Sequence, residues 1–305
     1  MNKDKALFRL EREKLLLTGE IPRLFMKYAL PGVAGLLFLG IQSVIDGIVL
    51  GRFVGANALA SVNLVLPCYS LISAFAIVMG IGGQTLVSIS LGRGDKQEAN
   101  NALRSVFVFL LGMSVVVSLV IFLSAGKIAS FLGANEVLLP DAVHYIRALV
   151  PFFPLLCAIF FGDYIIKAMG HPLYATSVMG MTVVLNIVLD LVFVAVLGWG
   201  VMGAGLATGI AFTMGACFNV PRLFSRHEVV AVQRGRYDRR LVWNAFYNGS
   251  SEGMSELSVA ITVFLFNITM MRYLGESGVA AFTAINYILF IGTTVFLGIS
   301  DGIIP

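Results

Sequence analysis

The sequence predicts an all-α integral membrane protein with about eight transmembrane helices. Of its 305 residues, 58% are hydrophobic and only 12% are charged, and a soluble chain of this length has no core large enough to bury so much apolar surface. The apolar residues also gather into stretches of about 20 residues or more, the length of an α-helix that crosses a bilayer. Basic residues concentrate in alternate connections between these stretches, as in multi-pass proteins.

The apolar stretches define the predicted helices in chain order. The second and the last are longer than a bilayer core requires, so these helices are expected to tilt or to extend beyond it. Residues 1–24 are predicted to form a cytoplasmic amphipathic N-terminus, and 225–251 a basic cytoplasmic linker. The predicted spans are 25–50, 58–91, 103–124, 144–168, 173–197, 203–224, 252–272 and 278–305.

Lysines and arginines predict the orientation of these spans. They gather before the first span and in the second, fourth and sixth connections. Those segments should therefore be cytoplasmic, the N-terminus included. The same asymmetry accounts for the net charge of +4, so no nucleic-acid partner is predicted. The linker is expected to be solvated, with contact to anionic lipid as the less favoured alternative. The basic residues assigned to the other side are Arg52, Lys127, Arg147 and Arg272.

A weak internal repeat predicts two lobes. The string that begins Arg52-Phe-Val-Gly resembles the one that begins Arg272-Tyr-Leu-Gly, and each opens a span on the outer side. Six spans separate the copies, so the two halves should have the same orientation, an arrangement known in transporters with a substrate site between the halves. The first unit, 25–224, holds six spans, whereas the second, 252–305, holds two. We therefore expect a complete N-lobe, the start of a C-lobe, and a C-terminal truncation or fragment.

Carboxylates inside the apolar stretches are the candidate functional residues. Charged groups are costly in a bilayer and usually face a cavity or an ion path. Asp46 and Asp190 each follow an amide residue by four positions, Gln42 and Asn186, so each pair shares a helix face. If the two aspartates meet, they could hold one proton or one Na⁺. The alternative is a solvated Asp46 and a helix-packing hydrogen bond at Asp190. Pro31, in the first span, permits a kink.

Two further pairs of charged residues have competing interpretations. Glu252 and Glu256 share a face at the start of the seventh predicted span. They could bind a second cation or line the inner vestibule where an organic cation enters, or they could cap the helix after two serines. Asp163 and Lys167 are also four residues apart, and a local salt bridge is favoured over a proton relay.

Enzymatic chemistry has little support in this sequence. The three cysteines lie in apolar stretches without metal-ligand spacing, and the three histidines form no cluster. Glycine-rich strings such as 80–83 and 203–209 lack the context of a phosphate-binding loop and are typical of close helix packing. We predict neither catalytic residues, nor a cofactor, nor a bound metal other than Na⁺.

Several strings together resemble the multidrug and toxic compound extrusion (MATE) family. Their order and spacing match over nearly the whole chain, and the last one resembles the bacterial multidrug-exporter branch. The strings are Tyr28-Ala-Leu-Pro31, Val44-Ile-Asp-Gly-Ile-Val-Leu-Gly-Arg-Phe-Val-Gly55, Ser88-Ile-Ser-Leu-Gly-Arg-Gly-Asp-Lys-Gln-Glu-Ala99, Lys167-Ala-Met-Gly-His-Pro172, Leu185-Asn-Ile-Val-Leu-Asp190, Gly200-Val-Met-Gly-Ala-Gly-Leu-Ala-Thr208 and Asn248-Gly-Ser-Ser-Glu252.

The resemblance implies twelve helices in two six-helix lobes and alternating access. It further implies efflux of drugs or organic cations in exchange for H⁺ or Na⁺, by a monomer in the bacterial cytoplasmic membrane. The cation site of the family would map onto Asp46, Asn186 and Asp190, with Pro31 as the proline of the bending helix. Gln42 stands where related proteins often carry tyrosine.

Two other functions stay open. One is a flippase or exporter for a lipid-linked or amphiphilic anion, which should carry several arginines in its central cavity, whereas these spans carry almost none. The other is an inactive truncated membrane remnant.

Overall fold

The computed structural model describes residues 44–255 except 133, 135 and 226, together with isolated positions between 33 and 42 and between 258 and 296. In this part of the chain the ordered elements are all helical. After a helical segment at 44–53, they are α3 (Ala56–Gly92), α4 (Lys96–Leu123), α5 (Ala125–Phe131), α6 (Leu139–Leu149), the 3₁₀ turn η1 (Val150–Phe152), α7 (Phe153–Ala168), α8 (Pro172–Asp190), the π-helical η2 (Leu191–Val196), α9 (Gly200–Leu223), the 3₁₀ turn η3 (Val232–Arg234) and a helix at 239–255.

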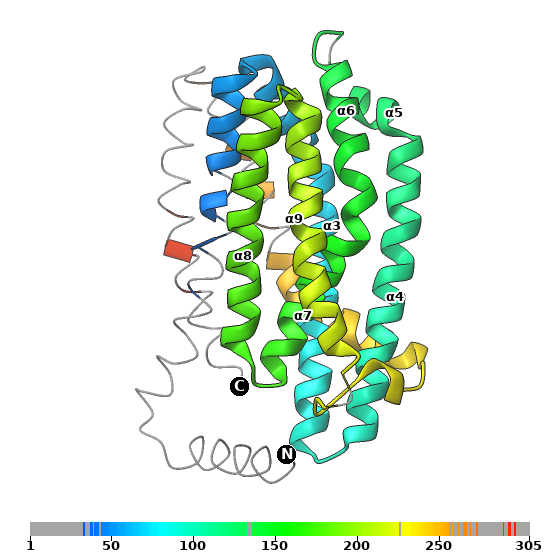
Figure 1. Ribbon diagram of the computed structural model, residues 1–305. Coiled ribbons are helices and arrows are strands. Elements are labelled where there is room, and N and C mark those ends of the chain that lie inside the picture. Colours follow the sequence, from blue (N-terminus) through cyan, green and yellow to red (C-terminus); the bar gives the residue numbers. More distant parts are fainter. Residues whose placement is uncertain are drawn as a thin grey trace.

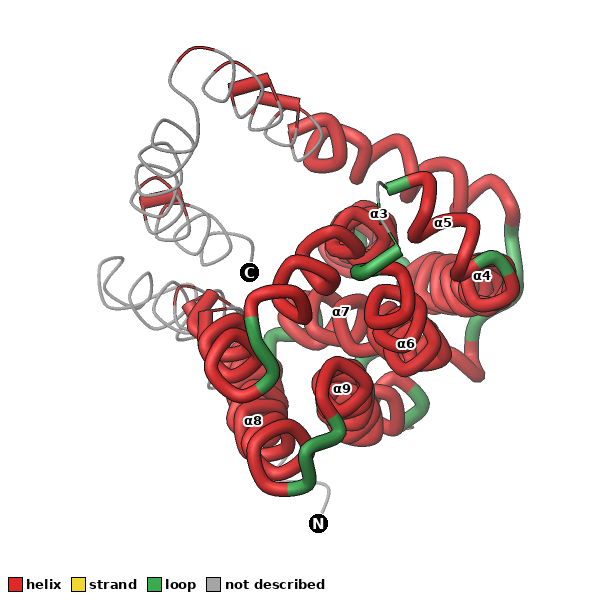
Figure 2. Tube along the Cα trace, turned by 90° about the horizontal axis from the view of Figure 1, so that it is seen from above, coloured by secondary structure: helices red, strands yellow, loops and turns green. Residues whose placement is uncertain are grey.

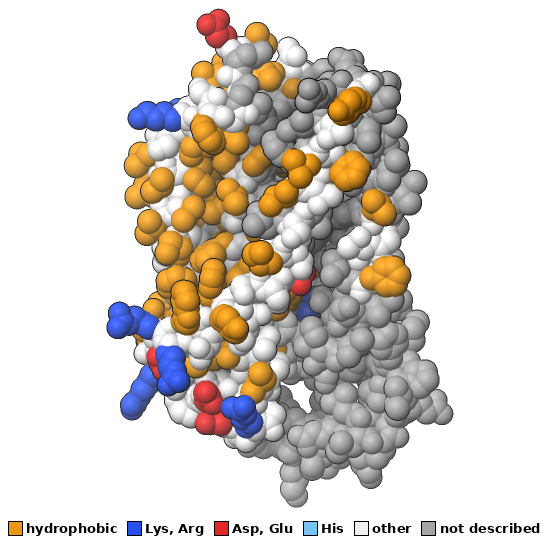
Figure 3. All heavy atoms as spheres, turned by 180° about the vertical axis from the view of Figure 1, so that it is seen from behind, with side chains coloured by type: hydrophobic (Ala, Val, Ile, Leu, Met, Phe, Trp, Pro, Cys, Tyr) orange, Lys and Arg blue, Asp and Glu red, His pale blue; other side chains and the backbone are white. Residues whose placement is uncertain are grey.

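Five helical stretches within the described residues are long and apolar enough to cross a membrane. They confirm the second to sixth predicted spans, and the first, seventh and eighth fall largely outside the described residues. The five are Val65–Gly92, Lys96–Leu123, Leu139–Ala168, Pro172–Val196 and Gly200–Leu223. Exposed apolar side chains cover the middle of the face in Figure 3, and most of its charged side chains lie at the two ends. That surface suits a bilayer.

Local sequence accounts for the turns between these helices. Between α3 and α4, Gly94 has φ 76°, a left-handed conformation that glycine adopts without steric cost. The next residue, Asp95, caps α4 because its side chain accepts a hydrogen bond from the Glu98 N–H at 2.9 Å. This turn, the turn between α7 and α8, and the segment after α9 all lie at one end of the bundle (Figure 1).

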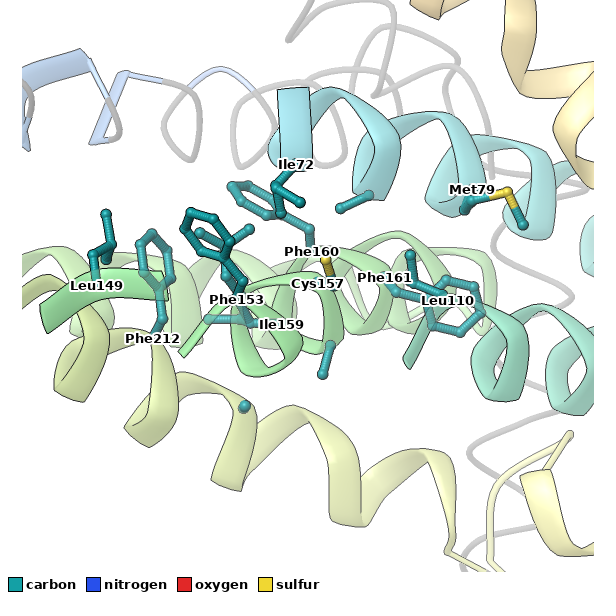
Figure 4. Packing of buried hydrophobic residues seen from close by; sticks show 14 of the residues in the cluster. Ile72, Met79, Leu110, Leu149, Phe153, Cys157, Ile159, Phe160, Phe161 and Phe212 are labelled. Atoms are coloured by element: carbon teal, nitrogen blue, oxygen red, sulfur yellow. The ribbon is translucent and has the colours of Figure 1, made fainter. Parts of the chain in front are cut away.

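Helix α7 lies at the centre of the bundle and packs against α3, α4, α8 and α9 (Figure 2). Its large side chains interdigitate with the neighbouring helices: the rings of Phe161 and Phe107 are 5.7 Å apart, and those of Phe160 and Phe212 are 6.0 Å apart. Figure 4 shows this layer of aromatic and aliphatic side chains. Because these large side chains fill the space between the helices, their burial favours one fixed arrangement of the helices.

Glycines allow the closest helix contacts, as the sequence predicts. A Cβ at Gly209 would overlap the ring of Phe152, and one at Gly215 would overlap Ile159. On α3, a Cβ at Gly82 would overlap the backbone oxygen of Ala245. Small residues at these positions let the backbones approach each other.

Residues 239–255 form one continuous helix, so the predicted boundary between linker and seventh span, at 251/252, lies inside a helix. The helix begins after Asp238, whose side chain accepts a hydrogen bond from the Arg240 N–H at 2.8 Å. Leu241, Val242 and Ala245 are buried. The arginines at the start of this helix interrupt the apolar pattern, which is why the sequence places its beginning later.

Three side chains anchor the segment after α9 to the bundle. The Glu228 carboxylate accepts a hydrogen bond from Arg222 Nε at 2.9 Å and lies 3.3 Å from His171 Nε2. The hydrogen bond with His171 and the charge of Arg222 hold the pKa of Glu228 below its usual range, although partial burial opposes this. Arg222 also lies over the ring of Tyr174, 4.2 Å from its centroid.

Glu228→Gln is expected to destabilise the protein by about 1–2 kcal/mol at neutral pH, because it removes a charge-assisted interaction. A lowered folded-state pKa contributes stability that is fully present above the unfolded pKa, about 4.3 for glutamate, and is lost as pH falls through the folded value. The difference between variant and wild type should therefore vanish in acid. Thermal unfolding midpoints in detergent across this pH range test it, with the exposed Glu136→Gln as control. A constant difference at all pH values would contradict the ionic origin.

Candidate functional site

Two aspartates from distant parts of the chain meet inside the bundle. Asp46 lies in the helical segment 44–53, and Asp190 is the last residue of α8. Their carboxyl groups interact electrostatically with each other, and the side chain of Gln42 lies next to Asp46. Asp190 is only 1% exposed. The two carboxyls, which spacing alone could not place together, are therefore neighbours.

The backbone changes its helical geometry directly after Asp190. Helix α8 continues as the π-helical segment η2, in which the N–H of Leu197 donates to the carbonyl of Val192 at 2.8 Å. A π-helical turn inserts an extra residue into the helix and occurs frequently at functional sites. Asp190 thus stands at the junction of two helical geometries.

Asn186 is oriented by a contact with α9. Its Nδ2 donates to Thr208 Oγ1 at 3.3 Å, and the Thr208 hydroxyl donates to the carbonyl of Ala204 at 3.1 Å. Asn186 is fully buried. The contact with Thr208 fixes the orientation of the amide, and its oxygen, Asn186 Oδ1, is buried without a hydrogen-bond partner among the described residues.

Five side-chain oxygens of this group are buried without a hydrogen-bond donor among the described residues. An unsatisfied buried acceptor costs about 1–3 kcal/mol, and more when it is charged. None of these five oxygens accepts a hydrogen bond from the described part of the chain, so a proton or an oxygen-seeking cation would relieve the cost. The five atoms are Gln42 Oε1, Asp46 Oδ1, Asn186 Oδ1, Asp190 Oδ1 and Asp190 Oδ2.

Three residues of the site's surroundings are missed by sequence reasoning. Thr208 lies in a glycine-rich string that indicates helix packing, and it performs that role as well. Tyr69 on α3 lies within electrostatic range of Asp46, and Tyr145 on α6 lies within range of both aspartates. A hydroxyl in an otherwise apolar span was the available signal. This signal does not reveal which residue the hydroxyl contacts.

The other predicted residues lie elsewhere. Pro31 and Glu256 are outside the described residues. Glu252 is half-buried on the helix 239–255, beside Gly249 and Gly253, which pack on Val78 of α3. Helix capping by Glu252 is excluded, because that helix begins at residue 239.

Asp163 and Lys167 form the predicted local salt bridge. Lys167 Nζ lies 2.7 Å from Asp163 Oδ2, and both residues belong to α7. Their side chains are 10% and 13% exposed, respectively, so the ion pair is largely buried.

Comparison with known proteins gives consistent matches. The profile of the family described as MatE matches residues 31–192. The multidrug export protein MepA of Staphylococcus aureus (strain MSSA476) is 21% identical over 305 residues, which are 99% of this chain and 66% of that protein. MepA of Staphylococcus haemolyticus has the same identity and coverage. The chain thus spans just under two thirds of the length of these curated relatives.

Solved structures share the fold. A MATE structure in complex with MaD3S superposes with a TM-score of 0.88 at 26% identity, over 94% of this chain and 65% of that one. A MOP superfamily transporter from Pyrococcus furiosus superposes with a TM-score of 0.86 at 26% identity, over 94% of this chain and 64% of that one.

Proposed function

Since this chain belongs to the MatE family, we propose that it serves secondary active efflux of drugs or organic cations in exchange for H⁺ or Na⁺. The chain is a multi-pass membrane protein, and its basic residues favour a cytoplasmic N-terminus in a bacterial inner membrane. It acts as a monomer in this proposal. The curated relatives are multidrug export proteins, which supports small, structurally diverse substrates.

The pair of neighbouring carboxyls, Asp46 and the buried Asp190, carries the proposal. Two neighbouring carboxyls such as those of Asp46 and Asp190 cannot both be ionised in a low-dielectric interior without strong repulsion. One proton shared between them removes the repulsion and supplies the missing donor. One Na⁺ would instead be coordinated by oxygens of Asp46, Asp190, Asn186 and Gln42. In both cases the bound cation favours a conformation that draws the helical segment 44–53 and α8 together.

The ion and the substrate are coupled because each favours a different arrangement of the same lobe. The lobe with a bound H⁺ or Na⁺ favours one arrangement, and a cationic substrate favours the other, so release of one promotes binding of the other. A bound ion shifts the equilibrium only by its difference in affinity for the two arrangements. In this mechanism Pro31 bends the first span, and Glu252 and Glu256 bind the substrate or a second cation.

Efflux of ethidium from cells that lack their own multidrug exporters tests this function. Cells that express the chain should lose ethidium faster than cells with an empty vector, and collapse of the H⁺ and Na⁺ gradients should remove the difference. Equal rates in both cells, with the protein present in the membrane, would contradict efflux by this chain. Export of a labelled amphiphilic anion instead of ethidium would favour the flippase.

A further inference from the structure

Residues 231–238, here called the strap, cross the end of α4 that lies beside the α3–α4 turn. Polar side chains of α4 bind the main chain of the strap. Gly235 lies so close that a Cβ there would overlap the backbone oxygen of Asn100. The hydrogen bonds run from Ala231 N to Asn100 Oδ1 at 2.7 Å, from Arg236 N to Asn101 Oδ1 at 2.6 Å, from Asp238 N to Ser105 Oγ at 2.8 Å, from Arg104 Nη1 to Gly235 O at 3.2 Å, and from Gln97 Nε2 to Arg234 O at 3.2 Å.

This anchoring holds three arginines at the surface. Arg236, Arg239 and Arg240 are exposed, and within the described part of the chain none of them forms an ion pair with a carboxylate. The nearby Asp238 is engaged with the backbone of Arg240 as a helix cap. Three arginines without a carboxylate ion pair therefore lie in residues 236–240, against one carboxylate, and hydrogen bonds from α4 fix the backbone where this run begins. Such an arrangement is a preorganised site for anionic groups.

Exposed aromatic side chains follow the arginines along one face of the helix 239–255. Trp243 and Tyr247 are 68% and 73% exposed, and they continue the face of Arg239 at successive intervals of four residues. Trp243 stacks on Phe246, with centroids 5.8 Å apart. About two turns beyond Tyr247, Met254 is 61% exposed.

The order along this face is charged, then amphipathic, then apolar. Arginine heads, tryptophan and tyrosine rings, and apolar side chains take these successive depths at a membrane–water interface. The buried Leu241, Val242 and Ala245 occupy the opposite face, so the aromatic face is directed away from the bundle. The strap also lies at the end of the bundle that the charge distribution assigns to the cytoplasm.

We propose that Arg236, Arg239 and Arg240, together with Trp243 and Tyr247, bind anionic phospholipid headgroups of the cytoplasmic leaflet. A guanidinium group can donate two parallel hydrogen bonds to a phosphodiester, and each basic side chain near an anionic leaflet adds to the attraction. The lipid would fix the strap, and with it the start of the helix 239–255, at the membrane surface. The proposal depends on the orientation of the chain and not on its transport activity.

Quenching of Trp243 fluorescence by brominated lipid tests the proposal. The chain has two tryptophans, so Trp199→Phe leaves Trp243 as the only reporter. This protein is placed in bilayer nanodiscs that mix phosphatidylcholine with phosphatidylglycerol, and either the neutral or the anionic lipid carries bromine near the headgroup. Preferential quenching by brominated phosphatidylglycerol is expected, at an affinity roughly 100-fold above that for phosphatidylcholine.

Arg236→Gln, Arg239→Gln and Arg240→Gln together should abolish this preference. The matched control removes the same charge with Arg52→Gln, Lys127→Gln and Arg147→Gln, which are exposed residues assigned to the opposite side of the membrane, and it should retain the preference. Equal quenching by both lipids in the Trp199→Phe protein would overturn the proposal, as would a preference that survives in the triple arginine variant. Neither result depends on ethidium efflux, so failure of the lipid site and failure of the transport function are distinguishable.

Discussion

Asp190→Asn is expected to abolish cation-coupled efflux while leaving the protein folded. Asparagine has nearly the shape of aspartate, but it can neither ionise nor exchange a proton. Its amide NH₂ can donate to the neighbouring Asp46 carboxylate. The substitution therefore replaces the two opposed acceptors of the ion-free pair with a donor and an acceptor, and we expect a gain of about 1 kcal/mol in stability over the ion-free wild type. Ethidium efflux should fall to the level of the empty vector.

Asp46→Asn should have the same effect on efflux, because the cation needs both carboxyls. The control is Asp141→Asn, a substitution in the first turn of α6, which should leave efflux unchanged. Thermal unfolding in detergent and dye efflux in cells are measured on the same variants. Coupled efflux that persists in both Asp46→Asn and Asp190→Asn would show that this site does not bind the coupling ion.

Gly82→Val is expected to detach the helix 239–255 from α3. A Cβ at Gly82 would overlap the backbone oxygen of Ala245, and no change of rotamer can move a backbone atom away. A Cβ at Gly249 would likewise overlap the backbone oxygen of Val78. Overpacking of this kind costs about 1–3 kcal/mol when the structure can adjust, and more when backbones collide. We expect a loss of stability at or above the top of this range.

Hydrogen exchange and thermal unfolding in detergent measure the effect of Gly82→Val. Amides of residues 239–255 should exchange faster in the variant, whereas those of α7 should be less affected. Gly112→Ala is the control, because a Cβ at that position meets nothing within 4 Å, and alanine favours a helix by about 0.5–1 kcal/mol over glycine. Equal exchange at 239–255 in the Gly82→Val variant and the wild type would disprove the close packing.

Helix existence could be predicted from the sequence far better than contacts between helices. The apolar stretch at 144–168 predicts the span that the structure places at Leu139–Ala168, because hydrophobicity alone determines which segments enter a bilayer. The structure divides this span at the 3₁₀ turn η1, near Pro151. Hydrophobicity gives no information about such a local change of geometry, for which Pro151 within η1 was the available sequence signal.

In the candidate site, too, local relations could be predicted and contacts between helices could not. Spacing of four residues correctly placed Asn186 and Asp190 on one face of α8, since that relation is local. The approach of Asp46 to Asp190, and of Thr208 to Asn186, depends on how separate helices pack. The strap is a stronger case, because its backbone is bound by side chains of α4 that lie far away in the sequence. A charged and irregular stretch therefore appears as a solvated linker when only neighbouring residues are considered.

Ion release on substrate binding is the most direct test that Asp46 and Asp190 bind the coupling cation. Ethidium is added to the purified protein in weakly buffered detergent solution, and a pH electrode and a Na⁺-selective electrode follow the ions released. Release of one H⁺ or one Na⁺ per protein is expected from the wild type, and no release from the Asp46→Asn, Asp190→Asn double variant. Equal release from the double variant and the wild type would contradict this assignment.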